Sequence, residues 1–348
     1  MENWGRFYIG LTINIIDFQY QYPYHTIGHI PPIYMKKDLP KEIQDLYLPD
    51  SSSHKGQNGR LLIIGGSRLF HAASFWSLKV ASRIVDLVHY SSIEENNRIV
   101  QRLKEEFRDG IVVPRVEIES YINEDDCILI GPGMIRAEEA EIRNSKFEIR
   151  NLADIESINS EGLQTYHLTR YLLQKYPHKK WVIDAGALQM LDPDWIPKSA
   201  ILTPHKREFK LLKLKTKNIK LPPSLKLRRT SKTKMQNAKL EEQVKLFAKE
   251  HDCTILLKGE VDYISSPNKF REIKGGNAGM TKGGTGDVLA GLVSAFYCKN
   301  DAFTASVTAS YVNKKAGDDL FEKMGYWFNA SDLTDQIPVT MKKLVSEG

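Results

Sequence analysis

Short apolar runs recur along the chain, separated by stretches with the spacing of amphipathic helices. Continuous apolar runs of this length are typical of strands that are buried on both faces of a parallel sheet. Strands that alternate with helical stretches indicate βαβ units. The pattern therefore predicts an α/β fold with a mostly parallel central sheet, whose strands include Leu61–Ile64, Cys127–Ile130, Trp181–Ile183, Ala200–Leu202 and Thr254–Leu257.

Each of these five strands is followed at once by residues that suit ligand binding. Ligands of parallel α/β sheets bind at the carboxyl ends of the strands. Glycine, serine, aspartate, histidine and lysine at five successive strand ends therefore predict the rim of an active site. The segments are Gly65-Gly66-Ser67, Gly131-Pro132-Gly133, Asp184-Ala185-Gly186, Thr203-Pro204-His205 and Lys258-Gly259.

Helical periodicity and turn residues predict several further elements. A helix with an apolar face over residues 72–84 follows the first strand, and another covers residues 238–251. A hairpin is expected from Val261–Ile264 and Lys269–Ile273. The last predicted helix carries Phe303, Val307 and Tyr311 on one face.

These elements form one predicted domain over residues 51–335. Residues 1–50 are rich in tyrosine and proline, which favours an irregular N-terminal extension; a lid, an oligomer contact and a loosely ordered arm all stay open. Two segments interrupt the alternation and are interpreted as insertions, a charged one near 135–160 and a basic one near 213–234. Residues 336–348 are expected to be a weakly patterned tail.

The net charge of +6 is a property of one segment. Residues 206–239 contain thirteen lysines and arginines and one acid, Glu208, so this segment carries +12 and the rest of the chain −6. Such a charge run is usually a solvated loop, and it lacks the interleaved aromatic side chains that stack on bases. Nucleic-acid binding is therefore not the expected function.

Other broad features favour a cytoplasmic enzyme without a protein-held metal ion. The cysteines Cys127, Cys253 and Cys298 match no metal-binding or CxxC spacing. No apolar run approaches the roughly 20 residues of a membrane span. The N-terminus has the features of a poor signal peptide.

The stretch Gly275–Gly291 carries the most specific chemical signal. It holds seven glycines in seventeen residues and runs directly into an apolar helix with Val288, Leu289, Leu292, Val293 and Phe296 at helical spacing. A glycine-rich turn that leads into a helix N-terminus suits a phosphate. It matches neither a Walker A loop nor GxGxxG. Because Asp287 lies inside this turn, we interpret it as a catalytic base beside a phosphate.

These blocks, in this order, resemble the ADP- or ATP-dependent NAD(P)H-hydrate dehydratases, which repair damaged nicotinamide cofactors. The resemblance covers roughly residues 52–320 and implies a ribokinase-like three-layer α/β/α fold. Residues 1–50 are too short for the epimerase domain that is often fused in this family. The blocks are Lys55-Gly56, Gly65-Gly66-Ser67 with Phe70 and Ala72-Ala73, Gly131-Pro132-Gly133, Asp184-Ala185, Thr203-Pro204-His205 with Glu208, Lys258-Gly259 and Gly275–Gly291.

The resemblance implies a role for each matching residue. Asp287 would take the proton from the ring hydroxyl of the hydrate as it attacks the terminal phosphoryl group, and loss of phosphate would restore the reduced nicotinamide. The anion hole would be Gly283, Gly284, Thr285 and Gly286, and the hydrate would contact Ala73, Gly133, His205 and Asp287. The nucleotide, ADP or ATP with Mg²⁺, would contact Lys258, Gly259, Glu260, Val261, Asp262 and Gly286. A homo-oligomer and a separate epimerase protein are implied partners.

Three departures from the family pattern, at Ala72, Ile84–Leu87 and Ile135, are expected on the substrate side. A ribokinase-like kinase for a hydroxymethylpyrimidine, a thiazole alcohol or a sugar is the alternative enzyme. A non-catalytic nucleotide- or RNA-binding protein is the alternative of another class. The choices of ATP or ADP and of NADH or NADPH hydrate stay open.

Plainer roles also stay open for single residues. Asp287 could be a helix N-cap, worth about 1 kcal/mol. His205 could be a hydrogen-bonded loop histidine, and Lys258 a solvated lysine at a strand end. Gly131–Gly133 could be a tight turn, since glycine and proline favour turns.

Overall fold

The computed structural model describes residues 39–216 and 239–346. Within these ranges, nine strands form one sheet in the order β3-β2-β1-β4-β5-β6-β7-β8-β9. The pairs from β3 to β7 are parallel, and the last two pairs are antiparallel. The strands are β1 (Arg60–Ile64), β2 (Leu87–Ser91), β3 (Ile111–Val112), β4 (Cys127–Ile130), β5 (Lys180–Ile183), β6 (Ile201–Leu202), β7 (Thr254–Leu257), β8 (Asp262–Ser265) and β9 (Phe270–Ile273).

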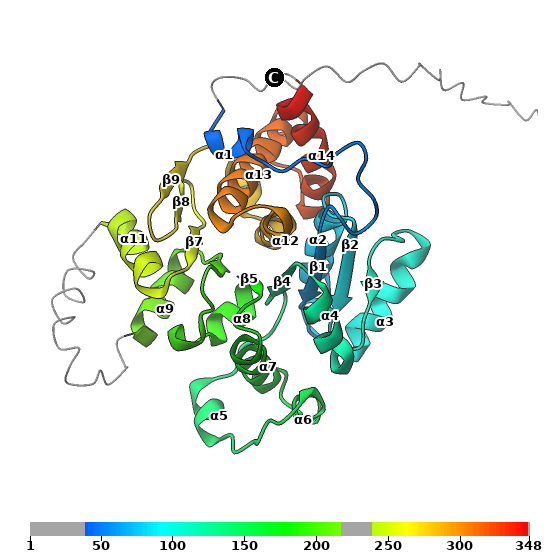
Figure 1. Ribbon diagram of the computed structural model, residues 1–348, viewed down its shortest axis with the longest axis vertical. Coiled ribbons are helices and arrows are strands. Elements are labelled where there is room, and N and C mark those ends of the chain that lie inside the picture. The colour runs from blue at the N-terminus through cyan, green and yellow to red at the C-terminus, as the bar shows by residue number, and fades with distance from the viewer. Residues whose placement is uncertain (1–38, 217–238, 347–348) are drawn as a thin grey trace, which may run out of the picture.

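Helices cover both faces of the sheet (Figure 1), so the expected three-layer α/β/α architecture is confirmed. One face carries α1 (Lys41–Gln44), α2 (His71–Ala81), α12 (Thr285–Lys299), α13 (Ala302–Met324) and α14 (Ala330–Ser346). The other face carries α4 (Ile118–Glu124), α6 (Leu152–Glu156), α7 (Glu161–Lys175), α8 (Ala185–Met190), α9 (Lys206–Thr216) and α11 (Leu240–His251), while α3 (Glu94–Arg102) lies by the β3 edge and α5 (Glu139–Asn144) packs on α7.

The first strand shows why the apolar runs predicted a sheet that is buried on both faces. Leu61 and Ile63 pack into the core beneath α2 and α12. Leu62 and Ile64 pack into the core on the opposite face, beneath α4. All four side chains are fully buried. A continuous apolar run is therefore required, because alternate residues of a strand face opposite sides.

All five predicted strands and the predicted hairpin are present, with ends that differ by at most one residue. The helix expected after the first strand is α2, the one expected before β7 is α11, and the one expected to carry Phe303 is α13. The strands β2 and β3 were not predicted. The first contains His89, buried and paired with Asp125 at 2.9 Å, and the second has only two residues.

The expected tail, 336–348, differs from the structure, because α14 extends through this segment to Ser346. Ile337 is fully buried in the core. The Thr340 hydroxyl donates to the Asp319 carboxylate of α13 at 2.7 Å. The segment looked weakly patterned because its buried face contains polar side chains that find partners on α13.

The end of the expected N-terminal extension also packs on the domain. Ile43 of α1 is buried, Glu42 pairs with Arg271 at 2.7 Å, and the Glu42 carbonyl accepts a hydrogen bond from Thr308. Residues 39–50 therefore belong to the fold rather than to an irregular arm. Residues 1–38 lie outside the described part of the chain.

The charged insertion near 135–160 forms the two short helices α5 and α6, and Asn151 makes a capping box with Asp154 at the start of α6. The basic insertion begins within α9, and its remainder from residue 217 lies outside the described ranges. Among the helices that are described, none is long and apolar enough to cross a lipid bilayer.

The packing of α14 on the core predicts that the protein loses stability when the buried face of this helix is changed. Replacing Ile337, which is fully buried, with alanine leaves a cavity and should lower the free energy of unfolding by about 2–5 kcal/mol. The matched control is Val339→Ala on the same helix, where the side chain is 45% exposed and the change should stay within about 0.5 kcal/mol. Urea unfolding measures both. Equal effects of the two substitutions would show that α14 does not pack as described.

Candidate active site

The glycine-rich turn reaches the strand ends because α12 crosses α2 at very short distance. A side-chain Cβ at Gly291 would lie 2.6 Å from the Ser77 carbonyl oxygen, and one at Gly284 would lie 2.3 Å from the Trp76 ring. Gly284 also has a φ of 97°, which disfavours other residues. The Ser77 hydroxyl donates to the Asp287 carbonyl at 2.8 Å. These contacts fix the N-terminus of α12 over the carboxyl ends of the strands.

The four residues of the expected anion hole lie around this N-terminus, with Gly284 as the N-cap. The N–H groups in the first turn of a helix have no acceptors inside the helix. At Gly283 a Cβ would meet nothing within 4 Å, so the turn is open on that side. The Thr285 hydroxyl instead closes the turn, donating to the Met280 and Lys282 carbonyls at 2.6 and 3.0 Å.

Asp287 is the third residue of α12, and its carboxyl group has an unusual environment. Burial raises its pKa, the nearby Asp184 carboxylate raises it further, and the Lys258 ammonium lowers it; the resulting pKa is about 7. A carboxyl group with this pKa exchanges its proton near neutral pH, as a general base must. Its side chain is not the N-cap, since Gly284 takes that position.

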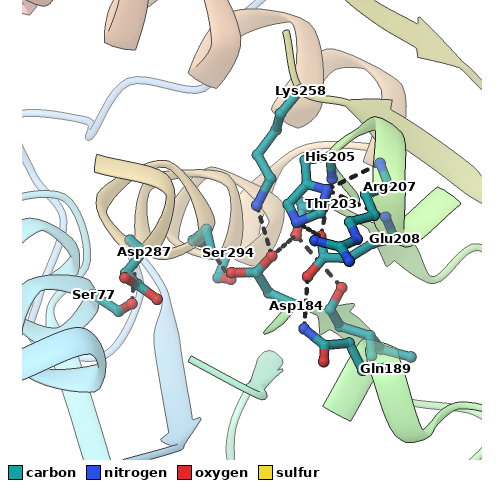
Figure 2. Close-up of polar contacts among 12 residues, drawn as sticks. Ser77, Asp184, Gln189, Thr203, His205, Arg207, Glu208, Lys258, Asp287 and Ser294 are labelled. Atoms are coloured by element: carbon teal, nitrogen blue, oxygen red, sulfur yellow. Dashed lines mark hydrogen bonds and ion pairs between the residues drawn. The ribbon is translucent and has the colours of Figure 1, made fainter. Parts of the chain in front are cut away.

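Lys258 and Asp184 form an ion pair between β5 and β7 beside Asp287 (Figure 2). Lys258 Nζ donates to Asp184 Oδ1 at 2.8 Å, and the Thr203 hydroxyl donates to the same oxygen at 2.7 Å. Burial alone would lower the pKa of Lys258, but the carboxylates of Asp184 and Glu208 outweigh it and the pKa is raised. The lysine is thus a fixed cation, and a Cβ at Gly286 would lie 3.6 Å from its nitrogen.

His205 lies next to Lys258, since the backbones of the two residues continue the pairing of β6 and β7. Its Nδ1 accepts hydrogen bonds from the N–H groups of Arg207 and Glu208 at 3.1 and 3.2 Å, so it caps α9. The proton of the neutral ring must then sit on Nε2. The side chain is 52% exposed, and its Nε2 lies 3.6 Å from the Glu208 carboxylate.

The segment Lys258–Asp262 borders a cavity of about 700 Å³, a volume typical of ligand sites. Lys258, Gly259, Glu260, Asp262 and Gly286 line it, whereas Val261 is not among its lining residues. The carboxylate of Asp262 is used within the protein, accepting from the Gly259 N–H at 2.8 Å and from Ser310 at 2.7 Å. Asp262 therefore shapes the turn.

The other two predicted substrate residues lie together on the α2 side of α12. A Cβ at Gly133 would lie 2.9 Å from the Ala73 Cβ and 3.2 Å from the Gly66 Cα. Ala73 is one helical turn before Ser77, which bonds the Asp287 carbonyl. The structure therefore brings Ala73 and Gly133 to one side of Asp287, with the Lys258–Asp184 pair and His205 on the strand ends beyond it.

One expectation about the substrate side is wrong. Ile84–Leu87 follows α2 and ends at the first residue of β2, so it lies at the amino end of the strands, opposite the site. Val85 packs in the core there. Within the described residues, no cluster of histidine, cysteine, aspartate and glutamate could hold a metal ion.

Two residues in the site had no role assigned from the sequence. Asp184 was visible as a strand-end residue, but its pairing with Lys258 depends on β5 and β7 lying on either side of β6. Lys314 donates to the carbonyls of Gly259 and Glu260 at 2.9 and 3.1 Å. Its polarity could not have singled it out, because Asn313 and Lys315 flank it in the sequence.

Comparisons with known proteins give a consistent family. The bifunctional NAD(P)H-hydrate repair enzyme Nnr of Methanocaldococcus jannaschii is 32% identical over 91% of this chain and 57% of its own length. The chain thus spans little more than half of that relative. The ADP-dependent (S)-NAD(P)H-hydrate dehydratase of Nitrosopumilus maritimus is 30% identical over 88% of this chain and 97% of its own.

Structural similarity supports the same fold. A ribokinase-like superfamily protein from Enterococcus faecalis superposes with a TM-score of 0.66, 22% identity, and coverage of 88% of this chain and 96% of its own. The ribokinase-like fold inferred from the sequence is therefore confirmed. The model of the NAD(P)H-hydrate dehydratase family matches residues 61–339, and the chain belongs to this family.

Proposed function

We propose that this chain catalyses the nucleotide-dependent dehydration of NAD(P)H hydrate to NAD(P)H, a metabolite-repair reaction. The observation that carries the proposal is Asp287, a half-buried carboxyl group with a pKa of about 7 at the N-terminus of a helix whose glycine turn borders a nucleotide-sized cavity. The relative from Nitrosopumilus maritimus is named as ADP-dependent, which supports ADP as the phosphoryl donor.

The reaction has two balanced stages. First, the ring hydroxyl oxygen of the hydrate bonds to the terminal phosphorus of the nucleotide as the bond to the bridging oxygen breaks. Asp287 takes the hydroxyl proton. Phosphate then leaves the ring carbon with the electrons of that C–O bond, and loss of a proton from the adjacent carbon restores the double bond. With ADP the products are NAD(P)H, AMP and phosphate.

Asp287 contributes through both its position and its pKa. It sits in the first turn of α12, where a phosphoryl group bound at the glycine turn would be close to its carboxylate. With a pKa of about 7, a large fraction is ionised at neutral pH, yet it is basic enough to accept a proton. A positioned base of this kind typically supplies about 10²- to 10⁴-fold in rate.

The fixed cation Lys258 and the open N–H groups of the glycine turn would stabilise the phosphoryl group in transfer. Such preorganised charge is the main catalytic help in phosphoryl transfer. Asp184 Oδ1 accepts hydrogen bonds from both Lys258 and Thr203. The Thr203 hydroxyl thus fixes the carboxylate, and the carboxylate fixes the lysine. The nucleotide would occupy the cavity lined by Lys258 to Glu260 and Gly286.

The hydrate would approach from the side of Ala73 and Gly133, where a side chain larger than hydrogen at Gly133 has no room. The Nε2–H of His205 would donate to it from the strand end. The residues present also fit Mg²⁺ delivered with the nucleotide, because this ion is usually held by phosphate oxygens and waters with few protein ligands. Bound there, it would neutralise phosphate charge.

The remaining partners are predictions of the same proposal. A homo-oligomer is expected, and a separate epimerase protein would supply the hydrate epimer that the dehydratase accepts. The activity is expected in the cytoplasm. Both NADH hydrate and NADPH hydrate are to be tried as substrates.

The direct test incubates the chain with NAD(P)H hydrate and ADP or ATP, and follows the near-ultraviolet absorbance of the reduced nicotinamide. Absorbance should return, and Asp287→Asn should lower turnover about 10²- to 10⁴-fold. The control is Asp335→Asn, a carboxylate that is 55% exposed and pairs with Lys79 and Arg83; it should retain activity.

Two outcomes would contradict the proposal. Phosphorylation of an alcohol without return of absorbance would indicate a small-molecule kinase. Retention of more than about a tenth of wild-type turnover by Asp287→Asn would exclude a general base at this position.

The raised pKa of Asp287 also predicts a pH-dependent effect on stability. Folding raises this pKa from 3.8 to about 7, so the native state keeps a proton that the unfolded state releases. The stability contributed by the protonated carboxyl group is present below about pH 4 and lost as the pH rises through about 7. Asparagine stays neutral and avoids this loss.

Asp287→Asn should therefore become more stable relative to the wild type as the pH rises from about 4 to about 8, with the change centred between the two pKa values. Urea unfolding across this range measures the difference. The exposed Asp335→Asn should show no comparable trend. A difference that is constant with pH would mean that the carboxyl group is not held in its neutral form by the fold.

A further inference from the structure

The chain enters and leaves the hairpin of β8 and β9 beside the cavity at the glycine turn. Asp262 and Ile273 form the last pair of the hairpin ladder. The turn before β8, with Gly259 and Glu260, lines one part of the cavity, and the glycine stretch after β9, from Gly275, lines another. The carbonyl groups of these three residues lie outside the ladder, so the two walls of the cavity need another connection.

One side chain of α13 makes this connection. Lys314 Nζ donates to the carbonyls of Gly259 and Glu260 at 2.9 and 3.1 Å, and to the carbonyl of Gly275 at 3.3 Å. An ammonium group has three N–H donors, so these bonds use all of them. The side chain is 9% exposed, and the Asp262 carboxylate lies 3.4 Å from its nitrogen. Both the donors and the charge of Lys314 are therefore engaged within the protein.

A second residue of α13 holds the glycine stretch at the same point. The Asp318 carboxylate accepts from the N–H of Gly276 at 3.1 Å and from the Asn277 side chain at 3.3 Å. The carbonyl of Gly275 and the N–H of Gly276 belong to one peptide group, so Lys314 and Asp318 hold it from both ends. The two glycines have φ values of 110° and 73°. Because glycine leaves such a conformation easily, the two side chains are needed to fix it.

The walls of the cavity and the proposed base are held by different helices. Asp287 is fixed through α2, because the Ser77 hydroxyl donates to its carbonyl at 2.8 Å. The peptide group between Gly275 and Gly276 is fixed through α13. A change at Lys314 should therefore loosen the cavity and leave the base in position.

We propose that Lys314 and Asp318 are positioning residues, which set the affinity for the nucleotide by holding the two walls of the cavity together. The inference rests on the proposed function in placing ADP in this cavity. The competing explanation is that the two side chains act on the phosphates only through their charges. The two explanations differ in the sign of one effect, because Lys314 and Asp318 carry opposite charges.

Isothermal calorimetry of ADP with Mg²⁺, without the hydrate, compares the wild type with two variants. Lys314→Met removes the donors and a positive charge, and Asp318→Ala removes the acceptors and a negative charge. Both should bind ADP about tenfold more weakly, because the wall residues must then be ordered on binding. A role of charge alone predicts weaker binding by Lys314→Met and tighter binding by Asp318→Ala. That result, or unchanged affinity in either variant, would overturn the inference.

The matched control is Lys315→Met, which removes the same charge from the neighbouring residue. The Lys315 side chain is 43% exposed and pairs with Asp319 at 3.3 Å. This variant should bind ADP as the wild type does. An equal loss of affinity in Lys315→Met and Lys314→Met would show that the contacts of Lys314 with the two walls have no special role.

The turnover assay separates positioning from catalysis. With Lys314→Met, the KM for ADP should rise about tenfold while kcat at saturating ADP stays within about threefold of the wild type, the pattern of an interaction that contributes equally to ground state and transition state. A larger fall in kcat would place Lys314 in the chemical step and contradict a positioning role.

Hydrogen exchange followed by mass spectrometry tests the same contacts in the nucleotide-free protein, even for a variant that binds too weakly for calorimetry. Lys314→Met should exchange faster than the wild type over residues 259–277, while residues 285–299 of α12 should exchange at the same rate. Faster exchange throughout the chain would indicate a general loss of stability instead of a local role, and would overturn the inference.

Failure of this inference is distinguishable from failure of the proposed function, because calorimetry and hydrogen exchange use no hydrate. A wild type that binds ADP but does not restore the absorbance of reduced nicotinamide contradicts the proposed function alone. Variants that bind ADP as tightly as the wild type, while the wild type forms NAD(P)H, contradict the inference alone.

Discussion

The close approach of α12 to α2 is the constraint on which the site depends. The approach requires the absence of side chains at Gly284 and Gly291, where a Cβ would meet the Trp76 ring and the Ser77 backbone. It brings the first turn of α12 to the carboxyl ends of the strands, between the α2 side, with Ala73 and Gly133, and the strand ends. One packing contact thereby positions the glycine turn and the carboxyl group that follows it.

This placement also sets the electrostatics. Asp287 is partly removed from water, which raises its pKa, and Asp184 adds to the effect, while Lys258 limits it. The ion pair of Lys258 with Asp184 keeps a positive charge beside the turn without giving Asp287 a direct salt bridge. The result is a carboxyl group that is basic enough for proton transfer, next to groups that favour an anion. Both features follow from burial at a helix N-terminus.

The sequence was most informative where one pattern was sufficient to define an element. Strands such as Cys127–Ile130 are continuous apolar runs because both of their faces are buried, and Asp287 stood out because it lies within a glycine-rich turn. The failures have physical causes. Strand β2 contains His89, whose polarity is matched by Asp125 far away in the sequence, and α14 buries Thr340 against Asp319.

The central claim is that Asp287 acts as a base whose pKa the fold has raised to about 7. The most direct test is the pH dependence of kcat/KM for the hydrate at saturating ADP and Mg²⁺, because this parameter reports the ionisation of the enzyme before the hydrate binds. The account predicts that kcat/KM rises with pH and reaches half of its plateau near pH 7. A profile that is flat from about pH 5 to 8, or that reaches half of its plateau near the ordinary carboxyl pKa of about 4, would contradict it.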